Sequence, residues 1–369
     1  MKNQLKVLIN ALHAKSGGGV TYLQNILPFF ATEKSIETHL CIHESQSDIL
    51  NFVPEGVVVH ILKFRSGFFC LPFYEQILVP RLARHLSISV TFSPANYGPF
   101  FSPGHIILLR NTLSVGFLEK RFSKIIYWVL VFFATFFSMI FSKKIIAVSS
   151  FVLNSNGKIL SLLFRSKSLV IHHGVSNIYK PPKKEQMRDD FILVVSDLYV
   201  QKNIETLLLA LDRVRKKYPN VLLKIAGRNI DQGYFEQLQR IIMERAMENN
   251  VVFLGYINQS ELSILYKQCR FFIFPSLVES FGNPLLEAMA SGAPIASSNT
   301  AAMPEVIGNA ALYFNPRNTT EIADILDKLL KDEKLRNSLS KKSVERAKLF
   351  SWSKTAKETL DTIKSAAVR

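Results

Sequence analysis

Two glutamates eight positions apart, Glu279 and Glu287, mark the segment of this sequence that is richest in chemistry. Glu279 is expected on the loop after a short apolar strand at 271–274, and Glu287 about one turn inside the next helix. Carboxylates accept hydrogen bonds from hydroxyl groups, and the N–H groups of a helix N-terminus bind phosphate oxygens. The pair therefore predicts a site for a polar ligand, in preference to two ordinary surface acids.

The residues around these glutamates favour a sharp turn into that helix. Asn283 is expected to cap the helix, and Pro284 suits its first position, because proline has no N–H to leave unbonded. Gly282 lets a ligand come close to the backbone. Farther upstream, Lys202 follows an apolar run at 191–195 and opens another helical pattern, so it can reach a phosphate group. Without such neighbours, an ordinary solvated lysine would be the better interpretation.

An alternation of apolar strands and helical patterns extends along the chain and must position these side chains. It begins with a strand at 7–10 and a glycine turn at 17–19, and it restarts at 191 after a stretch rich in proline and charge. Alternation of this kind predicts parallel sheets covered by helices on both faces. We expect an α/β fold of two doubly wound Rossmann-like domains that face each other across a cleft, with the ligand at the carboxyl ends of strands.

The change in composition at 174–190 predicts a hinge between the two domains. The expected domains are residues 1–176 and 177–350. Residues 351–369 should form a last helix that can cross back to the first domain.

Charge and hydropathy predict a contact with a membrane surface. The formal net charge is +16, and the 65 residues from 120 to 184 hold 11 basic residues and no acidic one. Within them lies an uncharged apolar stretch of 18 residues, 125–142, which predicts a helix that enters the lipid interface. There are two alternatives to a helix in the lipid interface. One is a membrane span, which would place the two domains on opposite sides of the membrane, and the other is a helix wholly buried in the protein. Basic residues bracket the stretch: Lys120, Arg121, Lys124, Lys143 and Lys144.

The remaining composition narrows the cellular setting. Three scattered cysteines and the lack of a signal-like N-terminus predict a cytoplasmic protein, peripherally attached to the inner face of the cell membrane. A basic protein can bind nucleic acid, but no recognition motif accompanies the charge, so no nucleic-acid partner is expected.

The segment from Glu279 to Glu287 resembles the E-x7-E motif of the retaining family 4 glycosyltransferases, the glycosyl transferases group 1, which have the GT-B fold. The match extends to Val-Phe-Leu-Gly at 252–255, Pro-Glu-Val-Ile-Gly at 304–308 and Phe-Ser-Trp at 350–352. It is close over about 190–355 and holds only in outline over 1–180. Among the family's members, the bacterial surface-polysaccharide type is the nearest in character.

The resemblance implies a role for each site residue. Glu279 is expected to contact the donor sugar near its anomeric carbon, and Lys202 the diphosphate, so that these two are the expected catalytic residues. Glu287 is expected to bind the ribose hydroxyls of the nucleotide. Backbone groups of further residues are expected to bind the donor: Gly282, Asn283, Pro284, Gly18 and Gly19.

The sequence departs from the family pattern in both halves. Asp197 stands where the family usually has an arginine that binds phosphate, and Arg228 is the candidate that replaces it. Arg110 and Asn111 stand where many members have a histidine, and they are expected to bind an acceptor phosphate or hydroxyl. His13, before the glycine turn, could touch a ligand or be an ordinary turn residue.

The implied activity is transfer of a hexose from a nucleotide-diphosphate sugar, with retention, to a glycan or polyprenyl-diphosphate-linked acceptor. The pathway would be synthesis of a bacterial surface polysaccharide such as lipopolysaccharide O-antigen or capsule. No Asp-x-Asp motif lies in a fitting loop, so neither a metal nor another cofactor is expected. Two alternatives remain open here: a nucleotide-sugar epimerase of the same fold, or an inactive, membrane-associated transferase-like subunit.

Overall fold

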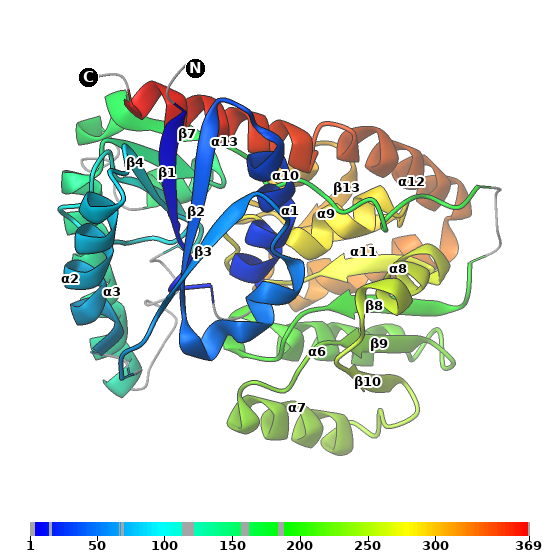
Figure 1. Cartoon of the computed structure of the whole chain (residues 1–369). Helices are drawn as coiled ribbons and strands as arrows, with labels where there is room; N and C mark the ends of the chain where they lie inside the picture. Colours follow the sequence, from blue (N-terminus) through cyan, green and yellow to red (C-terminus); the bar gives the residue numbers. More distant parts are fainter. Residues whose placement is uncertain are drawn as a thin grey trace. The chain divides into compact units, whose positions relative to one another are not determined.

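The structure, a computed structural model, divides into two compact units (Figure 1). Unit 1 comprises residues 1–174 and 351–369, and unit 2 comprises residues 175–350. The first division lies two residues before the predicted boundary at 176, and the second coincides with the predicted end at 350. The residues that the structure describes are 4–14, 17–65, 67, 70–112, 122–155, 162–183 and 188–367.

Unit 1 is built on a seven-stranded parallel sheet with the order β3-β2-β1-β4-β5-β6-β7. In strand β1, next to the switch of strand order, the apolar run Val7, Leu8 and Ile9 is fully buried, because helices cover both faces of a doubly wound sheet. The strands are β1 (Leu5–Asn10), β2 (Ile36–His43), β3 (Val57–Leu62), β4 (Val90–Ser93), β5 (Ile106–Leu109), β6 (Lys144–Ala147) and β7 (Ser168–Val170). The helices are α1 (Gly18–Thr32), α2 (Cys70–His85), α3 (Phe122–Phe141), α4 (Ser150–Ser155) and α13 (Trp352–Ala367), with 3-10 turns η1 (Glu44–Phe52) and η3 (Arg165–Lys167).

The C-terminal helix α13 belongs to unit 1, although it follows unit 2 in the sequence. The Tyr22 hydroxyl of α1 lies 3.2 Å from Thr359 Oγ1 of α13, and the rings of Tyr22 and Trp352 are 5.9 Å apart. Thr355 Oγ1 donates to the carbonyl of His172 at 2.7 Å. These contacts hold α13 against α1 and against the end of the segment 1–174.

Unit 2 repeats the architecture with six parallel strands in the order β10-β9-β8-β11-β12-β13. The strands are β8 (Phe191–Val195), β9 (Leu222–Ala226), β10 (Val251–Gly255), β11 (Phe271–Phe274), β12 (Ile295–Ser298) and β13 (Ala311–Phe314). The helices are α6 (Ile204–Val214), α7 (Gln232–Glu244), α8 (Gln259–Gln268), α9 (Asn283–Ala290), α10 (Met303–Ile307), α11 (Thr319–Lys331) and α12 (Glu333–Ala347), with the 3-10 turn η4 (Val200–Lys202). The predicted pair of doubly wound α/β domains is confirmed.

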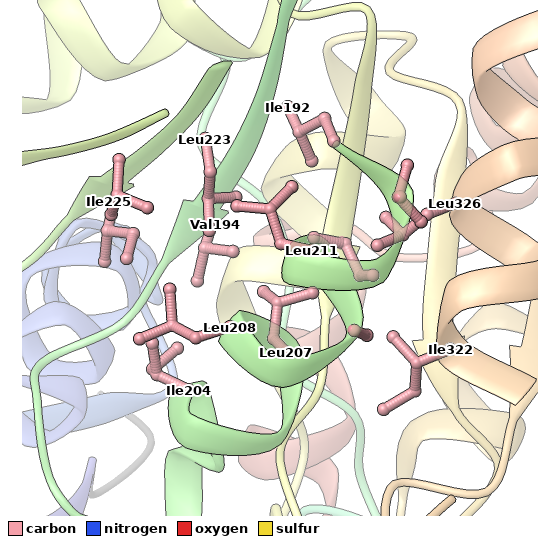
Figure 2. Close-up of a cluster of buried hydrophobic side chains, with 14 of the residues drawn as sticks. Ile192, Val194, Ile204, Leu207, Leu208, Leu211, Leu223, Ile225, Ile322 and Leu326 are labelled. Carbon is pink, nitrogen blue, oxygen red and sulfur yellow. The ribbon is translucent and has the colours of Figure 1, made fainter. Parts of the chain in front are cut away.

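The core of unit 2 forms where α6 and α11 meet the sheet. Apolar residues recur on α6 at the helical spacing of three and four, and this stripe packs on β8 and β9 (Figure 2). Complete burial of one such side chain contributes about 1.5–3 kcal/mol to stability. The buried side chains drawn there include Ile204, Leu207, Leu208 and Leu211 of α6, Ile192 and Val194 of β8, and Ile322 and Leu326 of α11.

Both sheets have one point where the chain changes direction along the strand order. In unit 1 this point lies between β1 and β4, and in unit 2 between β8 and β11. Loops leave the carboxyl ends of the two adjacent strands toward opposite sides there, and ligands of doubly wound sheets bind in the resulting crevice. These two switch points position the polar side chains considered next.

Candidate functional site

The switch point of unit 2 brings Lys202 and Glu279 together. Lys202 follows β8 and Glu279 follows β11, which are neighbours in the sheet although the two residues are 77 positions apart. Lys202 Nζ donates to Glu279 Oε1 at 2.6 Å. The two side chains are only 9% and 13% exposed. The structure thus pairs the two residues that sequence reasoning named as catalytic, in a nearly dehydrated ion pair.

The surroundings of Lys202 keep its ammonium charged. Burial by itself lowers the pKa of this lysine, but the charge of Glu279 and the contact with Tyr199 more than offset it, so the pKa lies above its usual value. The Tyr199 and Phe274 rings lie 5.2 and 5.8 Å from Nζ, where an aromatic face attracts a cation. A cation fixed in this way is suited to neutralise a phosphate group.

Asn203 locks the loop that carries Lys202. Its backbone is left-handed, with φ 57°. Its Nδ2 donates to the carbonyls of Pro275 and Pro316 at 3.0 and 2.8 Å. Sequence reasoning gave neither this buried residue nor Tyr199, which contacts Lys202, a role in the site. An asparagine directly after the lysine was the available signal, because asparagine tolerates the left-handed conformation better than most residues.

The turn into α9 differs in one detail from the predicted capping. Gly282, and not Asn283, is the N-cap, and the helix begins at Asn283, so the predicted cap was wrong. Gly282 has φ 89°, which a residue with a Cβ rarely adopts, and a Cβ there would lie 2.9 Å from Leu285 Cδ1. The left-handed turn therefore requires glycine. Pro284 lies in the first turn, as expected.

Glu287 lies in the second turn of α9 and faces two tyrosines. The hydroxyl of Tyr266 donates to Glu287 Oε2 at 3.1 Å, and Tyr179 also contacts the carboxylate. Burial raises the pKa of Glu287 to about 7, although hydrogen bonds from both tyrosines act to lower it. The acid is therefore poised to change its charge near neutral pH.

Asp197 and Arg228 form an ion pair at the ends of β8 and β9. Arg228 Nη2 lies 2.9 Å from Asp197 Oδ2, and the backbone N–H of Arg228 donates to Oδ1 at 2.9 Å. The aspartate that departs from the family pattern thus holds the arginine that was expected to replace the missing one. Side-chain exposures of 48% and 28% leave the pair open to solvent.

The site residues predicted in unit 1 are the two glycines Gly18 and Gly19 and the adjacent pair Arg110 and Asn111. Gly18 and Gly19 form the first turn of α1, after Gly17 with φ 58°. The guanidinium of Arg110 packs under Gly19, where a Cβ would come within 1.9 Å of Nη1, and it donates to the carbonyl of His13 at 3.2 Å. Asn111 is exposed, and its backbone pairs with the Asn96 side chain. Arg110 therefore braces the glycine turn from below.

The apolar stretch predicted at 125–142 forms most of α3. Thr135, Ser138 and Met139 face inward and are buried, whereas many of the large apolar side chains are 38–50% exposed. In the described part of the chain, no helix has the length and apolarity needed to cross a membrane. Lys120 and Arg121 lie outside the described residues. The exposed set is Ile125, Ile126, Tyr127, Val129, Leu130, Phe132, Phe133, Phe137, Ile140 and Phe141.

Comparison with known proteins agrees with this geometry. Residues 176–346 match the family model of the glycosyl transferases group 1. The chain is 32% identical over 192 residues to the serotype-specific mannosyltransferase WbdA of Escherichia coli, covering 51% of this chain and 23% of WbdA. It is 31% identical over 178 residues to the E. coli O-antigen chain mannosyltransferase B, covering 47% of this chain and 45% of that one. The chain thus spans less than half the length of these relatives.

Among solved structures, Anabaena HepE in complex with UDP and glucose is similar over the whole fold. The TM-score is 0.77 at 17% identity, with 98% of this chain and all of that chain covered. A likeness at this identity reports on the fold, and it includes both doubly wound units. The chain therefore has the GT-B fold, and its residues 176–346 match the glycosyl transferases group 1 family.

Proposed function

We propose that this protein is a retaining hexosyltransferase that uses a nucleotide-diphosphate sugar. The acceptor is a glycan or a polyprenyl-diphosphate-linked sugar in the synthesis of a bacterial surface polysaccharide such as O-antigen. Unit 2 binds the donor and unit 1 the acceptor. Retention comes from the family resemblance, and the named mannosyltransferases of O-antigen synthesis support the pathway.

The Lys202–Glu279 pair carries this proposal. In the reaction, the bond between the anomeric carbon and the phosphate oxygen breaks, and the nucleoside diphosphate leaves with the electron pair. A bond to the acceptor oxygen forms, and the proton of the acceptor hydroxyl passes to the departing diphosphate. The Lys202 ammonium stabilises the charge that grows on the diphosphate, and a dry site strengthens that interaction. Glu279 contacts the donor sugar near the anomeric carbon.

Further donor contacts come from other residues of unit 2. Glu287, when ionised, accepts hydrogen bonds from the two ribose hydroxyls. Gly282, Asn283 and Pro284 present backbone groups to the sugar and phosphates at the start of α9. Arg228 offers a second cation, oriented by Asp197. No metal or cofactor enters the proposed mechanism, because the lysine and the helix N-terminus neutralise the diphosphate.

Unit 1 supplies the remaining elements of the proposal. We assign donor binding to the glycine turn with Gly18 and Gly19, and acceptor binding to Arg110 and Asn111. Exposed rings and aliphatic side chains on α3, next to exposed Lys143, suit insertion into an anionic membrane surface. We propose that this face holds the enzyme at the inner face of the cell membrane, where a polyprenyl-linked acceptor resides.

A thermal-shift screen tests the donor proposal. The ligands are UDP, GDP, UDP-glucose and GDP-mannose, and a ligand that binds only the folded state raises the melting temperature. At least one diphosphate should stabilise the wild-type protein, and Lys202→Ala should weaken that shift. Lys217→Ala, which removes a solvent-facing lysine paired with Asp327, is the matched control. No shift with any of the four ligands contradicts the proposal, and isomerisation of a nucleotide sugar without acceptor favours an epimerase instead.

A further inference from the structure

A cluster of polar side chains surrounds a buried acid in unit 1. Glu75 of α2 is fully buried. Asn10 Nδ2 donates to Glu75 Oε1 at 2.6 Å and to Ser93 Oγ at 3.1 Å. His13 Nε2 lies 3.1 and 3.0 Å from the two carboxylate oxygens. Because a buried carboxylate without partners is costly, these two donors are needed to keep the acid in place.

The cluster lies at the switch point of the unit 1 sheet. Asn10 is the last residue of β1 and Ser93 the last residue of β4, and these strands are neighbours. His13 lies on the loop that leaves β1. This is the position that Lys202 and Glu279 occupy in unit 2, at the ends of β8 and β11. Topology alone therefore makes it the expected ligand position of unit 1.

The contact with Glu75 decides which nitrogen of His13 can meet a ligand. A carboxylate accepts, so the hydrogen bonds to Glu75 call for a proton on Nε2, and in the neutral form of the ring the lone pair is then on Nδ1. Within the described residues, the hydrogen bonds of the His13 ring run through Nε2 alone. The side chain is 13% exposed, which leaves the ring reachable. In this tautomer, Nδ1 of His13 is an acceptor for which the described residues supply no donor.

The ring and its loop are held rigidly. The ring of Tyr97 meets the His13 ring edge-on, with centroids 4.6 Å apart. Arg110 Nη2 donates to the His13 carbonyl at 3.2 Å, and Gln46 Nε2 donates to the carbonyls of Ala11 and Ala14 at 3.0 and 2.9 Å. Side chains fixed in this way lose little entropy when a ligand binds.

We propose that His13, oriented by Glu75, binds a hydroxyl group of the carbohydrate acceptor through Nδ1. The ligand must present a donor, because an unprotonated nitrogen and a phosphate oxygen both accept, and the nearby carboxylate repels anions. A sugar hydroxyl meets that requirement. The assignment of the ligand as an acceptor carbohydrate rests on the proposed function. The tautomer of His13 and the availability of its Nδ1 rest on the geometry of unit 1.

Nitrogen-15 NMR of the histidine side chains tests both parts, with methyl α-D-mannopyranoside as the probe. Wild-type His13 should show a protonated Nε2 and an unprotonated Nδ1, and the Nδ1 signal should move as the probe is added. Glu75→Gln should give a mixture of tautomers. His13→Asn should raise the dissociation constant of the probe about tenfold, the loss expected for one hydrogen bond. His60, whose Nε2 is bonded to His39 Nδ1, is the internal control that should not move.

Two outcomes overturn the inference. A proton on Nδ1 in the wild-type protein would show that Glu75 does not set the tautomer. An Nδ1 signal that does not shift when the probe is added, or an unchanged dissociation constant in His13→Asn, would show that the His13–Glu75 pair has only a structural role. Melting temperatures of both variants show whether the fold survives, and His13→Gln gives a second variant if one is unstable. Since the nucleotide screen reports on unit 2, its failure is separate from a failure here.

Discussion

Units 1 and 2 have the same strand order around their central strand, and both place polar side chains at the switch point. In unit 2 the pair is a lysine and a glutamate, both slightly open to solvent. In unit 1 a fully buried glutamate is paired with an asparagine and a histidine. A fixed cation suits phosphate, whereas the His13 tautomer that we propose, with Nδ1 unprotonated, suits a hydroxyl. The comparison teaches that topology sets the place of a site and that the side chains set its ligand.

The largest effect is expected from a substitution that breaks the Lys202–Glu279 ion pair of unit 2. Glu279→Gln keeps the shape of the side chain but removes its charge, so we expect turnover to fall about 100-fold, as for loss of one preorganised electrostatic contact. Some stability should be lost too, because Lys202 stays buried without its counter-charge. Steady-state kinetics and urea unfolding measure the two effects. Glu248→Gln, on the surface of the same unit, is the control, and near-normal turnover in Glu279→Gln would remove this residue from the mechanism.

The next largest effect is expected when the Lys202 ammonium is removed and Glu279 is kept. Lys202→Ala should lower turnover at least about tenfold, since a charge-assisted contact contributes about 1.5–3 kcal/mol. The acceptor concentration that gives half-maximal rate should stay the same, because the lysine belongs to the donor side. A change on the acceptor side alone would contradict the division of labour between the units.

A pH-dependent effect should sharpen the role of Glu287. Its pKa is raised to about 7 by burial, so the ionised fraction grows between about pH 6 and pH 8. If the carboxylate binds ribose, the affinity for the nucleoside diphosphate should rise several-fold over this range. Glu287→Gln should bind more weakly and with a flat pH profile, which isothermal titration calorimetry can measure. Tyr266→Phe removes a hydrogen bond that lowers the pKa of Glu287, so the rise should move to higher pH.

The same pKa shift predicts a stability effect with the opposite sign. The folded-state pKa is higher than the ordinary value of 4.5, so the folded protein favours the neutral acid. Ionisation then costs stability, and this cost is absent below about pH 4.5, grows as the pH rises, and is complete above about pH 7. The free energy of unfolding of wild type relative to Glu287→Gln should therefore fall between pH 5 and pH 8. A constant difference would show that burial does not shift this pKa.

The smallest effect on the stability of the protein is expected from substitutions on the exposed face of α3. Phe133→Ser with Phe137→Ser removes two exposed rings, so the melting temperature should hardly change. Sedimentation with phosphatidylglycerol vesicles should fall several-fold, because buried apolar area and anionic lipid together drive such binding. Phosphatidylcholine vesicles and Phe73→Ser, another exposed ring of unit 1, are the controls. Equal sedimentation of the double variant and wild type would exclude this face as the membrane contact.

The sequence was informative wherever local rules apply. The strand–helix alternation predicted both sheets, and the spacing around Glu279 and Glu287 predicted the turn into α9 with Pro284 in its first turn. The capping detail failed because the turn before α9 needs a left-handed backbone, which glycine adopts more easily than asparagine. Pattern alone did not reveal that Gly19 leaves room for Arg110.

What the amino-acid order determined by itself was the fold class, the family resemblance of its second half and a set of candidate residues for the proposed nucleotide-sugar site. Only the tertiary structure paired Lys202 with Glu279, Arg228 with Asp197 and His13 with Glu75. The physical reason is distance along the chain. Partners 31 to 77 positions apart meet only when the strand order brings their loops to one edge of a sheet.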